Sequence, residues 1–354
     1  MSEKVLMKGN EALAEAAIRA GCRFFFGYPI TPQTEVAAYL AKHMRKAGGT
    51  YVQAESEVAS INMVLGAAAA GKRVITSSSS PGISLMSEGI SYIAGCDLPA
   101  VIVNIQRGGP GLGGIQPSQS DYFQATRGLG HGDFHVLVLA PSTVQEMVNL
   151  TFEAFDLADL YRMPAMILGD GILGQMMEPC EFPEGTGRKL PEKTWAVTGT
   201  GGKRKKNIIN SLYLQPDELE RINFERFERY DQIKKTEQKS ETFMIEDADI
   251  VVVAYGAAAR VAKNAVVEAR AQGIKVGIIR PITLWPFPTD AVAKAAKTAK
   301  AFLSVELSMG QMIEDVKLSC ECSRPVYLCN RTGGMVMKPE EVLAKIQEIA
   351  GGVQ

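Results

Sequence analysis

The sequence predicts an α/β protein with a mostly parallel β-sheet, followed by a second, smaller α/β domain. Between residues 1 and 183, short apolar runs alternate with stretches of helical length. Strands that alternate with helices of this size form βα units around a mostly parallel sheet. The short runs are apolar at almost every position, as in strands that are covered on both faces. The same alternation returns in residues 248–354, which predicts the second domain.

The elements of the first domain follow one another in chain order. We expect its strands at residues 24–26, 51–53, 74–76, 100–105, 136–139 and 165–168. We expect its helices at residues 11–20, 33–46, 58–70, 83–94 and 143–160. The helix at 58–70 has hardly a polar residue. Because a helix that is apolar on every face has no side suited to water, we expect it to be buried.

Residues 184–247 have a different composition and are expected to form a linker. Gly, Pro and Lys are frequent at 185–206, and residues 217–239 are typical of a heavily charged helix. Such a helix has little to bury, so we expect it to rest on a neighbouring surface through a modest apolar stripe. That stripe consists of Leu219, Ile222, Phe227 and Tyr230.

The second domain, residues 248–354, is expected to be a small folded unit. Its strands are expected at 250–254, 276–279, 301–306 and 325–328, and its helices at 257–271, 290–299 and 339–350. The turn after its first strand contains Gly256 but lacks the G-x-G-x-x-G pattern of dinucleotide sites. We therefore interpret this domain as a docking unit rather than a cofactor site.

Composition narrows the class of function. The chain has 354 residues and a net charge of −1, so no broad basic face indicates a nucleic-acid partner. It shows neither a secretory leader nor an apolar stretch long enough for a membrane, and we expect a cytoplasmic protein. The cysteines fit reduced, buried thiols, and without a C-x-x-C-x-x-C run we expect no iron–sulfur cluster on this chain. They are Cys22, Cys96, Cys180, Cys320, Cys322 and Cys329.

One candidate site begins at the turn Tyr-Pro-Ile-Thr-Pro, residues 28–32, directly after the first of these strands. The prolines fix φ and push Tyr28 and Thr31 to extended backbone. This turn stands at the carboxyl end of a strand, which is where α/β sheets bind ligands.

Two carboxylates, Glu55 and Glu57, stand at the start of the apolar helix. Ser56 can cap that helix, and an acid in a first turn suits the helix dipole. A carboxylate that is buried beside a cleft is also a candidate for handling protons. The combination with the proline turn favours this functional interpretation over simple capping.

A third candidate is Arg107, which follows the strand at 100–105 and precedes a loop, residues 108–114, with five glycines. The planar guanidinium can hold an anion, and glycines let the backbone approach a ligand closely. The alternative is a flexible surface loop with a solvated arginine, but the loop lacks the charged residues of such loops. We interpret the hydroxyl-rich turn at 77–82 as a helix cap.

Taken together, these motifs resemble the alpha subunit of 2-oxoacid:ferredoxin oxidoreductases over nearly the full length. The resemblance rests on the turn at 28–32, on QAESE at 53–57 with its apolar helix, on the Ser-Pro-Gly turn and on QRGGP at 106–110. It extends to a transketolase C-terminal-like domain from about residue 248. Residues 77–82 and 109–120 are more similar to the branched-chain, 2-oxoisovalerate type than to the 2-oxoglutarate type.

This resemblance implies that residues 1–183 are a pyrimidine-binding domain for thiamine diphosphate. A separate beta subunit would hold the diphosphate and Mg²⁺. Glu57 would be the catalytic carboxylate that hydrogen-bonds the aminopyrimidine N1′, and Thr31 and Arg107 would bind the substrate. The residues implied to contact the cofactor are Tyr28, Pro29, Ile30 and Glu57.

We expect no metal ligand on this chain itself. Asp170 lies in a Gly-Asp-Gly sequence that resembles the opening of the thiamine-diphosphate metal motif. That motif needs an asparagine soon afterwards, and the next one, Asn207, lies in the linker. His43, His131 and His135 do not show the spacing of metal ligands.

The activity implied is oxidative decarboxylation of a 2-oxoacid, with a branched-chain substrate favoured. Coenzyme A would take the acyl group, and electrons would pass through [4Fe–4S] clusters on partner subunits to ferredoxin. The implied assembly is a dimer of heteromers with beta, gamma and ferredoxin-like subunits, as in anaerobic metabolism. Coenzyme A contacts and the identity of the oxoacid are left open.

Three alternatives remain at this stage. The substrate could be 2-oxoglutarate or pyruvate. The chain could instead be the pyrimidine-binding beta chain of a lipoamide-linked 2-oxoacid dehydrogenase. Finally, it could be a non-catalytic α/β scaffold in which Glu57 is only a cap.

Overall fold

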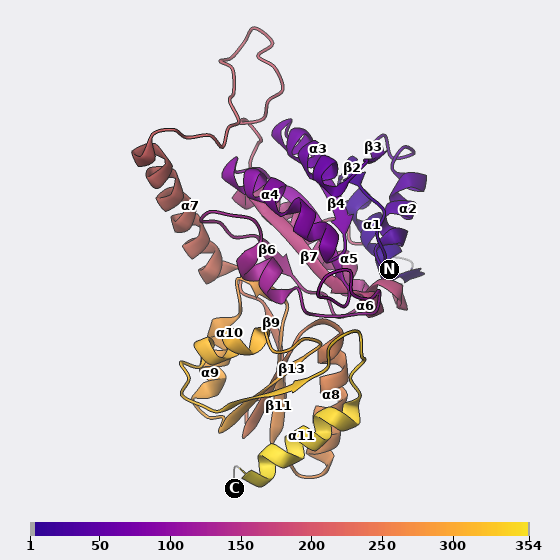
Figure 1. Ribbon diagram of the computed structural model, residues 1–354, viewed down its shortest axis with the longest axis vertical. Coiled ribbons are helices and arrows are strands. Elements are labelled where there is room, and N and C mark those ends of the chain that lie inside the picture. The colour runs from indigo at the N-terminus through magenta and orange to yellow at the C-terminus, as the bar shows by residue number, and fades with distance from the viewer. Residues whose placement is uncertain (1–3, 353–354) are drawn as a thin grey trace.

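Residues 4–352 are described here by a computed structural model, in which two α/β domains lie one above the other (Figure 1). The N-terminal domain is built on a seven-stranded sheet with the order β12-β6-β7-β5-β4-β2-β3. The C-terminal domain is built on a five-stranded sheet with the order β14-β13-β10-β11-β9. The predicted α/β fold class with mostly parallel sheets is confirmed.

Every strand and helix that the sequence predicts for the N-terminal domain is present, within a few residues of its expected ends. The strands are β2 (Phe24–Gly27), β3 (Thr50–Gln53), β4 (Val74–Ser78), β5 (Ala100–Gln106), β6 (Leu137–Leu139) and β7 (Pro164–Asp170). The helices are α1 (Gly9–Arg19), α2 (Thr34–His43), α3 (Glu57–Ala69), α4 (Pro81–Gly95) and α5 (Val144–Tyr161).

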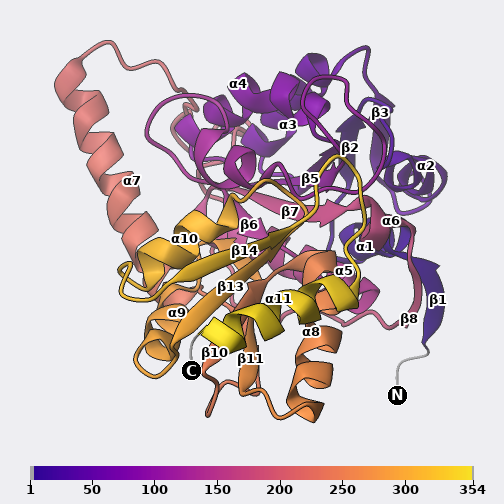
Figure 2. The same cartoon turned by 60° about the horizontal axis from the view of Figure 1, so that its bottom comes forward.

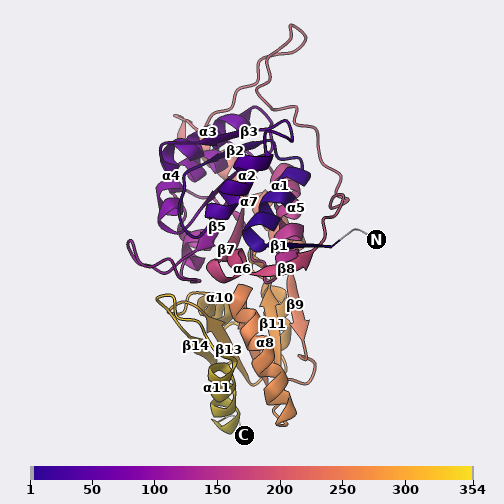
Figure 3. The same ribbon diagram turned by 90° about the vertical axis from the view of Figure 1, so that its right-hand side faces the viewer.

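The helices of this domain cover both faces of its sheet. Helices α1, α2 and α5 lie on one side, and α3 and α4 lie together on the other (Figure 3). All neighbouring strands from β3 through β6 are parallel. Their carboxyl ends therefore lie along one edge of the sheet, and the loops at that edge carry the predicted site.

The C-terminal domain has strands β10 (Ile250–Ala254), β11 (Val276–Pro281), β13 (Ala301–Glu306) and β14 (Val326–Asn330) and helices α8 (Gly256–Ala271), α9 (Thr289–Ala296), α10 (Met312–Ser319) and α11 (Pro339–Gly352). Residues along β10 alternate between two cores. Val252 packs with α8 and α11, whereas Val251 joins the core that continues into the N-terminal domain. This alternation is expected for a strand that is covered on both faces. Figure 2 shows α11 and α8 side by side.

The sequence did not predict two strands, β9 and β12, which lie near the junction of the two domains. Strand β9 (Ser240–Phe243) pairs antiparallel with β11, so the segment predicted as a linker, 184–247, contributes a strand to the second sheet. Strand β12 (Thr283–Trp285) pairs antiparallel with β6 and extends the first sheet. Helix α10 (Met312–Ser319) was also not predicted, nor were the short elements β1 (Val5–Lys8), β8 (Met177–Cys180), α6 (Gly171–Gln175) and the π-helix η1 (Gln124–Gly128).

The charged helix of the linker, α7 (Pro216–Thr236), runs along one side of the N-terminal domain (Figure 1). Its C-terminal half is anchored, because Tyr230 and Ile233 are fully buried and Arg226 donates to Asp97 at 3.2 Å. The predicted stripe is correct at Tyr230 but wrong at Leu219, which is 39% exposed. The helix is thus held at one end by apolar packing and an ion pair.

The prediction that α3 is buried is wrong for this chain by itself. One face of α3 covers the sheet through Ile61 and Val64, whereas Val58 and Met63 are 47% and 39% exposed. The neighbouring α4 likewise exposes Leu85 and Tyr92. Although α3 is apolar on all sides, one face of the layer formed by α3 and α4 is therefore exposed in this chain.

Two further predictions concern the cysteine side chains and membrane-spanning helices. All six cysteines are free, as predicted. The prediction that they are buried is correct for Cys22, Cys180 and Cys320 but wrong for the others. Cys96 and Cys329 are half-buried, and Cys322, in the turn after α10, is exposed. Between residues 4 and 352, the structure contains no helix with the length and apolar character needed to span a bilayer.

Candidate functional site at the carboxyl edge of the N-terminal sheet

The predicted residues come from four neighbouring strands and meet at one edge of the sheet. The 28–32 turn follows β2, Glu57 follows β3, the serine turn follows β4, and Arg107 follows β5. These strands are adjacent in the order β3-β2-β4-β5. The sheet therefore brings together motifs that are well separated in the sequence, as expected for parallel strands.

Glu57 is the first residue of α3 and is only 5% exposed. Capping of the helix is performed by Ser56, whose Oγ accepts from the Ala59 amide at 3.1 Å. The Glu57 carboxylate forms no hydrogen bond or ion pair with any residue in the described range. Because Ser56 already caps the helix, the Glu57 carboxylate is left free to accept a hydrogen bond from a group outside the chain. Glu55, the other candidate, is exposed.

Gly82, in the first turn of α4, leaves room for this carboxylate. A Cβ atom at Gly82 would lie 2.7 Å from Oε1 of Glu57 and 2.0 Å from Oγ of Ser78. Only glycine fits between these two side chains without a shift of the structure. The hydroxyls of Ser78 and Ser79 are buried and have no partner in the described part of the chain. The prediction that this turn is a helix cap is wrong for its side chains, because the N-cap residue Ser80 makes no side-chain cap hydrogen bond to α4. The turn is instead a close neighbour of Glu57.

Arg107 and the 28–32 turn are also brought together. Nη1 of Arg107 donates to the carbonyl oxygen of Thr31 at 3.0 Å, and Nη2 donates to that of Leu112 at 3.2 Å. Arg107 is 7% exposed, and its Nε has no partner among residues 4–352. The glycine-rich loop therefore folds back over the guanidinium instead of extending freely. Thr31 and Tyr28 are both exposed.

Arg107 is linked to the serine turn by a network that the sequence did not indicate. Its backbone amide donates to Ser80 Oγ at 3.0 Å. Ser80 donates to Asp121 at 2.6 Å, and Asn104 Nδ2 donates to the same carboxylate oxygen at 2.9 Å. Burial raises the pKa of Asp121, while these two hydrogen bonds act in the opposite direction. Ser80 has φ of 28°, a strained conformation for a residue with a side chain.

Gln33 is a second residue that sequence reasoning missed. It is fully buried, its Nε2 donates to the carbonyl of Tyr28 at 3.2 Å, and its Oε1 accepts from Ser77 at 2.6 Å. Gln33 thereby fixes the 28–32 turn to the end of β4. The sequence carries no signal for this role, because a glutamine after a proline turn can equally face solvent and its burial is visible only in the structure.

Asp170 and the histidines have structural roles in the described chain. Asp170 accepts from the amides of Ile172 and Leu173 at 2.9 and 3.1 Å and so caps α6. His135 stacks on Trp285 with ring centroids 4.5 Å apart. Across residues 4–352, no cluster of three or more His, Cys, Asp or Glu side chains could hold a metal ion.

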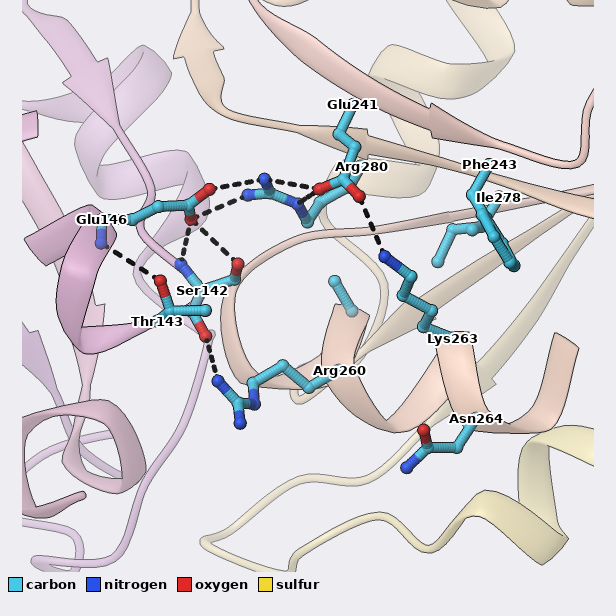
Figure 4. A pocket seen from close by; sticks show the side chains of 11 residues that line it. Ser142, Thr143, Glu146, Glu241, Phe243, Arg260, Lys263, Asn264, Ile278 and Arg280 are labelled. Carbon is cyan, nitrogen blue, oxygen red and sulfur yellow. Dashed lines mark hydrogen bonds and ion pairs between the residues drawn. The ribbon is translucent and has the colours of Figure 1, made fainter. Parts of the chain in front are cut away.

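A separate cleft of about 390 Å³ lies at the domain junction, between α5 and α8 (Figure 4). Arg280 donates to Glu146 at 2.7 Å and to Glu241 at 2.8 Å, and Lys263 donates to Glu241 at 2.9 Å. Because these charges already neutralise one another, the cleft is best explained as an ionic contact between the domains. None of the residues that line this cleft neighbours a residue of the carboxyl-edge site in the sequence.

Comparisons with known proteins agree with this geometry. Residues 15–242 match the family model "Pyruvate flavodoxin/ferredoxin oxidoreductase, thiamine diP-bdg", and residues 248–342 match "Pyruvate:ferredoxin oxidoreductase core domain II". The chain is 52% identical to the ketoisovalerate oxidoreductase subunit VorB of Methanothermobacter marburgensis, covering 98% of both chains. It is 38% identical to the 2-oxoglutarate synthase subunit KorA of Methanocaldococcus jannaschii, covering 95% of this chain and 97% of the relative.

Solved structures give the same picture. The 2-oxoglutarate:ferredoxin oxidoreductase from Magnetococcus marinus, solved with 2-oxoglutarate, coenzyme A and succinyl-CoA bound, superposes with a TM-score of 0.88 at 30% identity. The match covers 99% of this chain and 66% of that chain. A split-gene transketolase, with a TM-score of 0.62 at 14% identity over 98% and 99% of the two chains, shares the fold. The chain thus belongs to the thiamine-diphosphate-binding pyruvate flavodoxin/ferredoxin oxidoreductase family, which confirms the resemblance found in its motifs.

Proposed function

We propose that this chain is the alpha subunit of a thiamine-diphosphate-dependent 2-oxoacid:ferredoxin oxidoreductase of the branched-chain type. The observation that carries the proposal is the Glu57 carboxylate, which is buried, unpaired within the described chain and positioned beside Gly82. The 52% identity to a ketoisovalerate oxidoreductase subunit favours a branched-chain substrate over 2-oxoglutarate. The reaction converts a 2-oxoacid and coenzyme A to acyl-CoA and carbon dioxide, with electrons passing to ferredoxin.

The residues present fit the pyrimidine end of the cofactor. Glu57 would accept a hydrogen bond from N1′ of the aminopyrimidine, which satisfies a carboxylate that lacks any internal donor. The exposed Tyr28 and Pro29 and the half-buried Ile30 would lie against the ring. When bound, thiamine diphosphate supplies the electron sink for decarboxylation. Diphosphate and Mg²⁺ would be held by a separate beta subunit, since no metal cluster is found among residues 4–352.

Glu57 and Arg107 have different roles in this proposal. Glu57 controls a proton at N1′, so it acts by proton handling through a positioned acid. Arg107 would orient the carboxylate of the oxoacid together with Thr31, and its unpaired Nε offers a donor for an anion. The network of Ser80, Asn104 and Asp121 keeps Arg107 in place.

The test of Glu57 is the substitution Glu57→Gln in the complex co-purified with its partner subunits. We expect oxoacid-dependent reduction of ferredoxin or viologen to fall by at least about a hundredfold, because general acid–base groups contribute roughly 10²–10⁴ in rate. The subunits should still assemble. Glu55→Gln, an exposed neighbour, is the matched control and should keep its turnover. Turnover of the wild-type level in Glu57→Gln would overturn the proposal.

Arg107→Ala tests the substrate role. We expect the apparent KM for the 2-oxoacid to rise by roughly tenfold or more, as the loss of a charge-assisted hydrogen bond of about 1.5–3 kcal/mol implies. The KM for coenzyme A should change much less. Steady-state kinetics with each substrate varied in turn gives both constants. Equal increases in the two constants would contradict a role in binding the carboxylate.

The exposed α3–α4 face supports a partner subunit at this site. Val58 and Met63 on α3 and Leu85 on α4 are 39–56% exposed, and Glu57 stands at the start of the same face. We propose that the beta subunit covers it, with gamma and ferredoxin-like subunits carrying the iron–sulfur clusters. Met63→Glu should therefore reduce recovery of the beta subunit in co-purification. Phe224→Glu, at an exposed residue of α7, is the control, and equal recovery for both variants would contradict this interface.

The alternative function is that of the pyrimidine-binding beta chain of a lipoamide-linked 2-oxoacid dehydrogenase. It predicts acyl transfer to a lipoyl domain and no acyl-CoA without one. Assaying the complex with coenzyme A as sole acceptor, over a panel of branched-chain oxoacids, 2-oxoglutarate and pyruvate, distinguishes the two and ranks the substrates.

A further inference from the structure

Ser78, the last residue of β4, carries a hydroxyl group that the fold itself does not use. The residue is 0% exposed, and its Oγ has no hydrogen-bond partner in the described part of the chain. Most buried polar side-chain atoms in folded proteins are paired, so an unpaired one calls for an explanation. Contacts within residues 4–352 therefore give no reason for a hydroxyl at this position.

The Ser78 hydroxyl and the Glu57 carboxylate border the same small space. A Cβ atom at Gly82 would lie 2.0 Å from Oγ of Ser78 and 2.7 Å from Oε1 of Glu57. Because glycine has no side chain, nothing from residue 82 separates these two oxygens. A hydroxyl can donate a hydrogen bond and an ionised carboxylate can only accept one. The space thus has a donor without an acceptor on one side and an acceptor without a donor on the other.

The backbone is fixed on both sides of this space. Ser78 pairs with Asn104 of β5 in the parallel sheet, and the Gly82 amide donates to the carbonyl oxygen of Ser79 at 2.8 Å. Glu57 begins α3, whose first turn is capped by the residue before it. The two side chains remain free to rotate between staggered rotamers. Rotation of these side chains alone can therefore bring the hydroxyl to the carboxylate.

We propose that Ser78 is a positioning residue for Glu57, and that its hydroxyl donates a hydrogen bond to this carboxylate in the cofactor-loaded complex. The inference rests on the proposed function and deepens it. A hydrogen bond from a hydroxyl to a carboxylate is charge-assisted and belongs to the stronger class. With one carboxylate oxygen held by Ser78, the other stays free for N1′ of the aminopyrimidine. Ser78 itself touches neither the cofactor nor the oxoacid and acts through Glu57.

Ser78→Ala in the isolated chain tests whether the hydroxyl has a structural role instead. Because it pairs with no group in the described chain, its removal leaves no partner unsatisfied. The midpoint of urea denaturation should therefore stay the same or rise. A lower midpoint would show that the hydroxyl supports the fold and would overturn the inference.

The same variant in the assembled complex tests the positioning role. We expect kcat for oxoacid-dependent viologen reduction to fall by about tenfold, as the loss of one hydrogen bond to a charged group implies. The KM values for the oxoacid and for coenzyme A should change by less than about twofold, because Ser78 contacts neither substrate. Thr76→Val is the matched control, since it also removes a buried, unpaired hydroxyl from β4. It should leave kcat and the urea midpoint unchanged.

Cofactor binding gives a measurement that does not depend on turnover. Calorimetric titration of the cofactor-depleted complex with thiamine diphosphate should give a dissociation constant that is higher in Ser78→Ala, by about threefold or more. Thr76→Val should bind the cofactor as tightly as the wild type. A Ser78→Ala complex with unchanged kcat and unchanged cofactor affinity would overturn the inference.

A double variant decides whether Ser78 acts through Glu57. In the Glu57→Gln background, Ser78→Ala should lower kcat by less than about twofold further, because the effects of two interacting residues are not additive. A further loss of about tenfold would show an independent effect and would also overturn the inference. Failure of the wild-type complex to oxidise any 2-oxoacid would instead refute the proposed function, so the two failures are distinguishable.

Discussion

Two buried glutamates near helix starts, Glu57 and Glu306, show how differently the same group can be used. Glu306 ends β13, is 1% exposed and accepts five hydrogen bonds. Three come from backbone amides at the start of α10 and two from the hydroxyls of Ser304 and Ser308, at 2.8–3.0 Å. Glu57, 5% exposed, accepts none from residues 4–352. Burial is similar, and only the supply of donors differs.

This difference separates stability from function. A carboxylate with five donors stabilises the turn that contains it, because charge-assisted hydrogen bonds are the strong ones. The Glu57 carboxylate has no such internal donors, so it contributes little to the fold and stays available to a group outside the chain. The comparison therefore argues against the interpretation of Glu57 as a cap, a task that Ser56 performs.

The largest effect on stability is expected from Glu306→Gln. The amide nitrogen of glutamine would face backbone N–H groups that now donate to a carboxylate, and at least one donor would lose its partner. We expect the free energy of unfolding to fall by about 3–5 kcal/mol, measured by urea denaturation of the purified chain. Glu314→Gln, on the exposed side of α10, is the control. A loss below about 1 kcal/mol would mean that the five contacts contribute little.

Asp170 is a third buried carboxylate and gives an intermediate effect that depends on pH. Burial raises its pKa from 3.8 to about 6, despite backbone hydrogen bonds from Leu173, Ala257 and Ile172 that lower it. Because the folded-state pKa is raised, its favourable contribution is complete below pH 3.8 and is lost as pH rises through about 6. The loss is on the order of 3 kcal/mol.

Asp170→Asn isolates that contribution. Asparagine is also a good N-cap, so α6 should survive, and the variant should lack the loss of stability between about pH 4 and pH 7. Relative to wild type, the variant should therefore gain stability as pH rises. Unfolding free energies at several pH values give this difference, and a difference that does not vary with pH would contradict the burial of a titrating carboxylate.

Local patterns were sufficient for the main elements but not for the contacts between them. The predicted strands and helices coincide with those observed, because apolar runs and turn residues are local signals. Strand β12 was missed, since Thr283–Trp285 is short and its partner β6 lies far away in the sequence. Asp121 was missed for the same reason: its partner Ser80 precedes α4 and its partner Asn104 lies on β5, and both are distant from it in the sequence.

The two helices α3 and α7 show the limit of composition as a guide to burial. The apolar α3 leaves Val58 and Met63 exposed, whereas the charged α7 buries Tyr230, Ile233 and even Arg226. The ion pair between Arg226 and Asp97 offsets the cost of burying the Arg226 charge. The sequence of one chain could not show that α3 has a second surface available for a partner.

The smallest effect on stability is expected from Glu57→Gln, and it sharpens the comparison most. Because no donor pairs with this carboxylate in the described chain, replacing it with a neutral amide of the same size breaks no internal contact. The free energy of unfolding of the isolated chain should change by less than about 1 kcal/mol or rise slightly, as removal of an unpaired buried charge implies. Urea denaturation beside Glu306→Gln measures this directly. A loss as large as that of Glu306→Gln would show that Glu57 supports the fold, and lost activity in that variant could then no longer be assigned to proton handling.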